Sequence, residues 1–255
     1  MKKISVVIPS YNETANLEKG VLENVGDYLN RLKIDFEAFV VDDGSSDQSV
    51  ELIKKYIAKN ENFHLIQNSH GGKANTVISG MLQSSGGIVL FTDMDQATPI
   101  NQLEKFLPYF KIGFSAKGGP ASGWDIVIGS RHGRAGAPVL RKLSAWGFSL
   151  LRKIILGLPF EDTQCGFKAF NQKAIQRIIP KIKDGWGVLH TGGGAVNAGF
   201  DVEILYLAQK YGFKIAEVEV EWNYVDTERV QVFKDALAAI YDMFRIRWND
   251  LMGKY

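Results

Sequence analysis

The 255-residue sequence has a single cysteine, Cys165, and no marked excess of charge of either sign. A lone cysteine excludes an internal disulfide framework and a metal site made of cysteines alone. Lysine and arginine total 30 against 28 for aspartate and glutamate, so the formal net charge is only +2. Dedicated nucleic-acid binders usually carry a basic excess, and we therefore expect no nucleic-acid partner. The four histidines lack a metal-binding pair spacing, which argues against a zinc site.

Long apolar runs are also missing. Runs such as Gly87–Phe91 fall far short of the roughly 18 residues that a membrane-spanning helix needs. The basic residues Lys2 and Lys3 are not followed by the apolar stretch of a signal peptide, because Pro9 and Asn12 interrupt it. The sequence therefore predicts a cytoplasmic protein that is soluble or lies peripherally on the cytoplasmic membrane face.

Two common nucleotide-binding motifs are absent. The first predicted strand is followed by Pro9–Glu13 rather than by Gly-x-Gly-x-x-Gly, which weakens the case for a dinucleotide-dependent oxidoreductase. Gly71-Gly72-Lys73 lacks the spacing of a P-loop, although backbone N–H groups and a lysine at a helix start could still meet a phosphate.

What the sequence does contain is an alternation of strand and helix patterns. Short apolar runs predict strands over 4–9, 36–41, 63–68, 88–92, 124–129 and 214–222. Helical spacing predicts helices over 16–32, 49–59, 72–86, 140–156, 200–211 and 235–252. This order predicts an α/β fold, with a mainly parallel, Rossmann-like sheet flanked by helices and a C-terminal amphipathic helix.

Polar clusters stand at the ends of the predicted strands, where open parallel sheets bind their ligands. Asp93 and Asp95 follow the fourth strand, and their oxygens suit Mg²⁺ or Mn²⁺. Such an ion would neutralise a diphosphate leaving group. Asp-x-Asp is common in solvated turns, so its place at a strand end is what favours a metal site.

Two other polar clusters allow two interpretations each. Carboxylates within Asp42–Asp47 can accept hydrogen bonds from a nucleobase or ribose, or they can close a turn and cap the next helix. Arg131, Arg134 and Arg141 suit phosphate oxygens, or they form a solvated basic face.

The terminal helix carries apolar residues at roughly helical spacing and adds positive charge. The apolar residues are Phe233, Leu237, Ile240, Tyr241, Phe244 and Trp248, and the basic ones are Lys234, Arg245, Arg247 and Lys254. This pattern fits peripheral contact with an anionic membrane surface. More commonly, such a helix packs its apolar stripe on the domain core.

Several segments, in the right order, resemble the family 2 glycosyltransferases of GT-A fold: Val6–Glu13, Val41–Asp47 and Asp93–Asp95. Further segments are similar to the polyprenyl-phosphate glycosyltransferase branch: Ile128–Arg131, Asp162–Lys168 and Phe200–Leu205. The run Asp-Thr-Gln-Cys-Gly-Phe-Lys is most similar to dolichyl-phosphate β-glucosyltransferases, with the dolichyl-phosphate mannose synthases as neighbours. The resemblance covers nearly the whole chain.

The resemblance implies an inverting, metal-dependent transfer of a hexose from a nucleotide sugar, UDP-glucose, to a polyprenyl or dolichyl phosphate. It implies a GT-A catalytic domain over 1–230, with a nucleotide-binding half 1–98 and an acceptor half 99–230, followed by a helix over 231–255. Mg²⁺ or Mn²⁺ would bind Asp95 and Asp93. The nucleotide would meet Pro9, Tyr11, Glu13, Asp42, Asp43, Lys73, Asp93 and Arg229. Arg131 and Arg141 would hold the acceptor phosphate or the diphosphate, and Gln164 would shape the sugar and acceptor site, with Asp201 as the candidate base or positioning group.

One departure concerns the donor. Mannose synthases of this group often carry a glutamine two residues after the second aspartate, where this chain has Ala97 beside Gln96. The difference argues against their metal shell and against a mannose donor.

Two alternatives keep the donor site but change the activity. In one, the acceptor is a soluble sugar or another small molecule, whose hydroxyl would need a base. A phosphate monoester acceptor carries about −1.5 to −2 charge and needs little deprotonation. In the other alternative, the protein is a nucleotide-sugar binding module without catalysis.

Overall fold

The computed structural model describes residues 3–110, 123–131, 139–186, 198–223 and 232–255, without the side chains of 139–146, 183–186, 198 and 232–236. The strands of these ranges are β1 (Ile4–Ser10), β2 (Phe36–Asp42), β3 (Phe63–Gln67), β4 (Ile88–Thr92), β5 (Ile126–Ser130), β6 (Phe167–Asn171) and β7 (Ile215–Glu219). The helices before β5 are α1 (Thr14–Glu18), α2 (Val21–Arg31), α3 (Ser49–Ile57), α4 (Gly72–Gln83) and α5 (Leu103–Phe106), with short 3₁₀ turns at Ile100–Gln102 and Leu107–Phe110. Those after it are α6 (Val139–Leu156), α7 (Gln172–Trp186), α8 (Ala198–Lys210) and α9 (Val232–Leu251).

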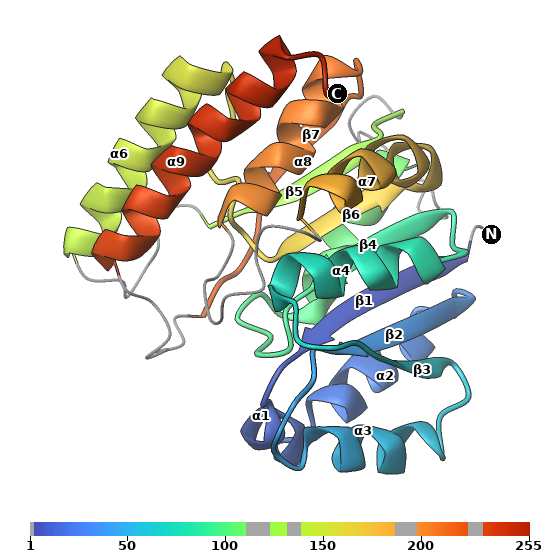
Figure 1. The fold of residues 1–255 in the computed structure, drawn as a ribbon. Helices are drawn as coiled ribbons and strands as arrows, with labels where there is room; N and C mark the ends of the chain where they lie inside the picture. The colour runs from blue at the N-terminus through green and yellow to red at the C-terminus, as the bar shows by residue number, and fades with distance from the viewer. Residues whose placement is uncertain (1–2, 111–122, 132–138, 187–197, 224–231) are drawn as a thin grey trace.

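The described strands form one sheet in the order β3-β2-β1-β4-β6-β5-β7. Parallel pairing joins β1 to β2 and β4, β2 to β3, and β5 to β7, whereas β6 pairs antiparallel with both β4 and β5. Figure 1 shows helices on both faces of this sheet, with α6, α8 and α9 together at the end away from β3. The predicted α/β fold, a mainly parallel sheet flanked by helices, is confirmed.

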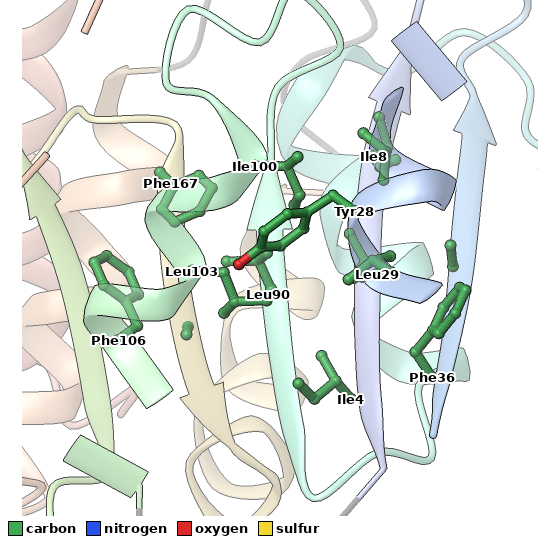
Figure 2. Close-up of a cluster of buried hydrophobic side chains, with 14 of the residues drawn as sticks. Ile4, Ile8, Tyr28, Leu29, Phe36, Leu90, Ile100, Leu103, Phe106 and Phe167 are labelled. Carbon is green, nitrogen blue, oxygen red and sulfur yellow. The ribbon is translucent and has the colours of Figure 1, made fainter. Parts of the chain in front are cut away.

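Side chains along the strands alternate between two cores, one on each face of the sheet. Val6 and Ile8 point to the face that α2 covers, and Val7 between them points to the face that α4 covers. Figure 2 shows the first core, in which Tyr28 and Leu29 of α2 pack over strands β1 and β4. Burial of this apolar surface is the main force that holds the helices on the sheet.

Two expectations about secondary structure need correction. The single helix expected over 16–32 is divided into α1 and α2, because Gly20 adopts a left-handed conformation with φ of 77°. Strand β6 was not expected, since its lysine, Lys168, interrupts the apolar pattern of a central strand. The division into 1–98, 99–230 and 231–255 stays a prediction.

The strand directions bring distant segments to one edge of the sheet. The parallel strands, including β1, β2, β4 and β5, end there, and β6 begins there because it runs the opposite way. The residues that follow β2, β4 and β5 therefore meet the residues that precede β6. This edge is where an open α/β sheet binds its ligands.

Within the described residues, no helix is both long and apolar enough to cross a bilayer.

At the opposite edge of the sheet, the buried carboxylate of Glu37 makes the stability of the fold depend on pH. Burial raises the pKa of Glu37, but hydrogen bonds from Lys3, Ser5 and Ser85 outweigh burial and lower the pKa from 4.5 to about 2. A depressed pKa means that the ionised group stabilises the fold above pH 4.5, by about 3 kcal/mol at most, and that this contribution is lost as the pH falls toward 2. We expect Glu37→Gln to lower the free energy of unfolding at pH 7 and to have a much smaller effect near pH 2.5. Urea unfolding at both pH values tests this, and an equal loss at both would contradict it.

Candidate active site

The turn after β4 presents two carboxylates at the carboxyl edge. Met94 is buried in the core with 2% exposure, so it anchors the turn while Asp93 and Asp95 on either side remain partly exposed. The side chain of Asp95 accepts a hydrogen bond from the Ala97 N–H at 3.0 Å. Gln96 has a positive φ of 49°, which folds the chain back tightly after Asp95. Both carboxylates therefore belong to one fixed turn after β4.

A lysine from the start of α4 lies against this turn. Lys73 Nζ is 2.6 Å from Asp93 Oδ1 and 5.3 Å from the centre of the Phe91 ring. Burial lowers the pKa of Lys73, but the carboxylates of Asp93, Asp201 and Asp95 raise it above its ordinary value. The ammonium is therefore charged at neutral pH, under the influence of three carboxylates, two from the turn after β4 and one from α8.

Asp201, in the first turn of α8, is held by a fully buried lysine of β6. Lys168 Nζ donates to Asp201 Oδ1 at 2.7 Å and also to the backbone carbonyl of Cys165, and its side chain has 0% exposure. A buried ammonium is tolerable only with such partners. Asp201 also contributes to the raised pKa of both Lys73 and Arg131. The structure thus brings Asp201 near Lys73, which was predicted on the nucleotide, and near Arg131, which was predicted on the acceptor phosphate or the diphosphate.

Arg131, directly after β5, is fixed by Asp162. Its Nε and Nη2 donate to the two carboxylate oxygens at 2.6 and 2.8 Å, and its backbone N–H donates to the same carboxylate. Burial lowers the pKa of Arg131, but the hydrogen bonds and the charge of Asp162 outweigh burial and raise the pKa above its ordinary value. The guanidinium therefore stays charged. The guanidinium carbon is 5.7 Å from the centre of the Trp222 ring. Since a guanidinium has five N–H donors and Asp162 takes two, donors remain for a phosphate.

The two aspartates at the end of β2 accept hydrogen bonds from the protein's own backbone. The Asp42 carboxylate is 1% exposed and accepts from the N–H groups of Gly44 and Ser45. The Asp43 carboxylate accepts from the N–H groups of Gly71 and Gly72 at 2.9 Å each, at the start of α4. The backbone N–H groups that might have met a phosphate are thus occupied by Asp43, which orients the helix that carries Lys73. A direct contact of Asp42 and Asp43 with the nucleoside stays a prediction.

Tyr11 and His70 form a stacked aromatic pair beside these aspartates. Their ring centres are 4.5 Å apart with an interplanar angle of 24°, and His70 Nδ1 is 2.9 Å from Asp43 Oδ2. Tyr11 is 37% exposed, so it has ring surface available to a planar ligand such as a nucleobase. Sequence reasoning assigned Tyr11 to the nucleoside and gave no role to His70.

The remaining predicted residues are placed as follows. Pro9 lies at the end of β1, and Glu13 precedes α1, where Asn16 donates to its carboxylate. Gln164 lies in the turn before β6, with its backbone N–H donating to Asp162. The side chain of Arg141 on α6 and the whole of Arg229 lie outside the described residues.

The donor set of the β4 turn fits a hard divalent cation. Asp93 and Asp95 offer only oxygen atoms, which Mg²⁺ and Mn²⁺ prefer. Among the residues that the structure describes, no group of three or more His, Cys, Asp or Glu is placed to hold a metal ion. A cation on these two carboxylates would therefore keep coordination positions for diphosphate oxygens, as Mg²⁺ does at nucleotide sites.

Cys165 is not a nucleophile in this arrangement. It has 0% exposure, and burial raises the pKa of its thiol above the ordinary value. The thiolate that a cysteine enzyme needs is therefore disfavoured.

Comparison with known proteins shows the family of this chain. The model of the glycosyl transferase family 2 matches residues 5–179. The chain belongs to glycosyltransferase family 2. A dolichyl-phosphate β-glucosyltransferase from Dictyostelium discoideum is 33% identical, over 98% of this chain and 75% of the relative. This chain is therefore a glycosyltransferase.

Solved structures agree with the fold of this glycosyltransferase. The mannosyl-3-phosphoglycerate synthase of Rubrobacter xylanophilus is 16% identical with a TM-score of 0.66, over 100% of this chain and 76% of that one. The glucosyl-3-phosphoglycerate synthase of Mycobacterium tuberculosis, solved with Mn²⁺, UDP and glucosyl-3-phosphoglycerate, is 20% identical with a TM-score of 0.58, over 99% and 80% of the two chains. The GT-A expectation for the sheet and its flanking helices is confirmed.

Gly166 offers a test of the position of Asp93. A Cβ on Gly166 would lie 1.9 Å from Asp93 Oδ2, so a methyl group there must displace the carboxylate. We expect Gly166→Ala to lower kcat of the glycosyltransferase about tenfold or more, because a small misplacement of a binding group is costly. Steady-state kinetics with circular dichroism as a folding control test this.

As a matched control, Gly212→Ala adds a methyl group where no atom lies within 4 Å, at a position whose φ of 75° costs some stability. Unchanged kcat in Gly166→Ala would place Asp93 outside the reaction.

Proposed function

We propose that the protein transfers glucose from UDP-glucose, with inversion, to a polyprenyl phosphate such as dolichyl phosphate, with Mg²⁺ or Mn²⁺ as cofactor. The observation that carries this proposal is the place of Asp201, whose charge acts on both Lys73 and Arg131. Lys73 and Arg131 are therefore both within electrostatic reach of one carboxylate. Two cations around a shared carboxylate suit a reaction between two phosphorylated substrates.

The donor side suits a nucleoside diphosphate sugar. Tyr11 offers a stacking surface for the base, and Lys73 offers a charged ammonium beside the β4 turn. A divalent cation on Asp93 and Asp95 would supply neutralisation of the leaving diphosphate. The solved relative with Mn²⁺ and UDP supports a divalent ion and a uridine nucleotide.

The acceptor side suits a phosphate monoester. Arg131 is held rigid by Asp162, so its remaining donors can orient a phosphate at little entropic cost. The phosphate is already ionised, so Asp201, which Lys168 holds in place, need not remove a proton and would instead position Lys73 and Arg131 around the reacting oxygen. The printed name of the Dictyostelium relative supports a dolichyl phosphate acceptor. We place the chain peripherally on the cytoplasmic membrane face, in contact through the C-terminal helix.

The experiment is a donor and acceptor screen of the purified protein. UDP- and GDP-sugars are incubated with Mg²⁺ or Mn²⁺, with and without a polyprenyl phosphate, and the lipid-linked product is measured. We expect UDP-glucose consumption that depends on both the metal and the lipid phosphate. Turnover with a soluble sugar acceptor instead would favour the small-molecule alternative. Calorimetric binding of UDP-glucose without any product would favour the binding module.

A further inference from the structure

His70, in the loop between β3 and α4, has no part in the function proposed above, yet it contacts two groups of the donor side. Its ring stacks on the ring of Tyr11, with the centres 4.5 Å apart and an interplanar angle of 24°. Its Nδ1 lies 2.9 Å from Asp43 Oδ2 and 3.2 Å from the Asp43 carbonyl oxygen. His70 thus joins the aromatic surface that is offered to a base with the aspartate that holds the start of α4.

The contacts of Nδ1 fix the orientation of the imidazole. Both neighbours of Nδ1 are oxygen atoms of Asp43 that accept hydrogen bonds, so Nδ1 carries the hydrogen and donates it. The Asp43 side chain is 4% exposed and also accepts from the N–H groups of Gly71 and Gly72, which makes it a fixed anchor. A ring that is tied at one nitrogen to a buried carboxylate has little freedom to turn, and it therefore offers a fixed face to its neighbour.

The backbone of His70 is held by the end of β2 as well. The Asn68 N–H, two residues earlier in the same loop, donates to the Asp42 carbonyl at 2.9 Å. Gly44 has a positive φ of 75°, and a Cβ there would lie only 3.1 Å from the His70 backbone nitrogen. The loops after β2 and β3 therefore pack closely against each other, and this packing sets the place from which the imidazole reaches Tyr11.

Tyr11 gains more from this support at its ring than at its backbone. The next residue, Asn12, already fixes the backbone, since its N–H donates to Ser45 Oγ and its side chain accepts from the Ser46 N–H, both at 2.9 Å. The Tyr11 residue is 37% exposed, and an exposed ring has several rotamers open to it. Stacking on a fixed imidazole favours one of them. A base then meets a ring that is already oriented, which lowers the entropic cost of binding.

We propose that His70 is a positioning residue of the nucleoside subsite, which holds the Tyr11 ring in the orientation that stacks on the base of a nucleoside diphosphate donor. The inference rests on the proposed nucleotide-sugar donor. The effect concerns the base and not the diphosphate, because the start of α4, which carries Lys73, is held by backbone hydrogen bonds to Asp43 that do not involve His70.

The test is calorimetric binding of UDP and of pyrophosphate, each with Mn²⁺, to the full chain without acceptor. His70→Ala should weaken UDP binding about fivefold and leave pyrophosphate binding within about twofold, because pyrophosphate has no base to stack. In steady-state kinetics, KM for UDP-glucose should rise by a similar factor while kcat stays within about twofold. Such a division is expected when the lost binding is equal in the ground state and the transition state.

Two further variants separate the ring of His70 from its hydrogen bond. His70→Phe keeps a stacking ring without the N–H donor, and His70→Asn keeps a donor without the ring. We expect His70→Phe to recover most of the UDP affinity and His70→Asn to behave as His70→Ala does. His64→Ala is the matched control, since His64 is an exposed histidine near the other end of β3, with its ring centre 5.3 Å from that of Phe39. It should bind UDP as the wild type does.

Three results in the variants would overturn the proposal. Unchanged UDP affinity in His70→Ala would remove His70 from the nucleoside subsite. An equal loss of UDP and pyrophosphate affinity would mean that His70 acts through the start of α4. Recovery in His70→Asn but not in His70→Phe would assign the effect to the bond with Asp43 instead of the stack.

The same measurements keep this inference apart from the proposed function. Wild-type protein that binds UDP but transfers no glucose to a polyprenyl phosphate would contradict the proposed function, while the binding data still decide the role of His70. Wild-type protein that binds no UDP would contradict both.

Discussion

Asp95→Ala is expected to lower glycosyl transfer roughly 10²- to 10³-fold while the fold survives. Asp95 and Asp93 are the carboxylates at the β4 turn, and within the described ranges no third His, Cys, Asp or Glu joins them to form a metal-binding group. Without Asp95, a divalent cation would have only Asp93, which already pairs with Lys73 at 2.6 Å. The assay is product formation from UDP-glucose over a series of Mn²⁺ concentrations.

Two companion variants separate charge from structure. Asp95→Asn keeps an oxygen that can accept the Ala97 N–H but loses the charge, so it should fold normally and be nearly as inactive as Asp95→Ala. Glu221→Ala removes an exposed carboxylate from the segment after β7 and should leave activity close to wild type. Full activity in Asp95→Asn at low Mn²⁺ would refute the metal assignment.

The fold was largely predictable because its signals are local. Each short apolar run ends in a polar turn, and the turns that follow parallel strands lie at one edge of the sheet, so the pattern alone places Asp93 and Lys73 at the same edge. Their contact is a finding of the structure. Strand β6 was not predicted because a buried lysine, Lys168, interrupts its apolar pattern. Lys168 is acceptable at 0% exposure because its ammonium donates to the Cys165 carbonyl and pairs with Asp201, 33 residues away. No local pattern shows the pairing with Asp201.

The site was less predictable than the fold, since the type of a polar residue does not show with which group it forms its hydrogen bonds. Asp43 looked like a ligand for a nucleoside, yet its carboxylate is committed to the N–H groups of Gly71 and Gly72. His70 had no motif around it, and only the structure shows it stacked on Tyr11. Arg131 was expected to bind a phosphate. That Asp162 fixes its guanidinium through two hydrogen bonds is seen only in the structure.

Lys168→Met is expected to cost about 3–5 kcal/mol of stability and to reduce kcat strongly. Methionine keeps the length of the side chain and removes its charge, so the variant leaves Asp201 without the ammonium 2.7 Å away. A carboxylate that loses its buried partner must be neutralised or turn away, and either change alters the charge that Lys73 and Arg131 experience. Urea unfolding measures the first effect, and steady-state kinetics measure the second.

A double variant tells whether Lys168 acts on the reaction through Asp201 or only holds the fold. Lys168→Met with Asp201→Asn removes both charges, so much of the lost stability should return, because no uncompensated charge remains in the interior. If Asp201 positions the cations of the site, kcat stays low in this double variant and in Asp201→Asn alone, although both are folded. Recovery of kcat together with stability would mean that the pair is structural and that the reaction proceeds without the carboxylate of Asp201.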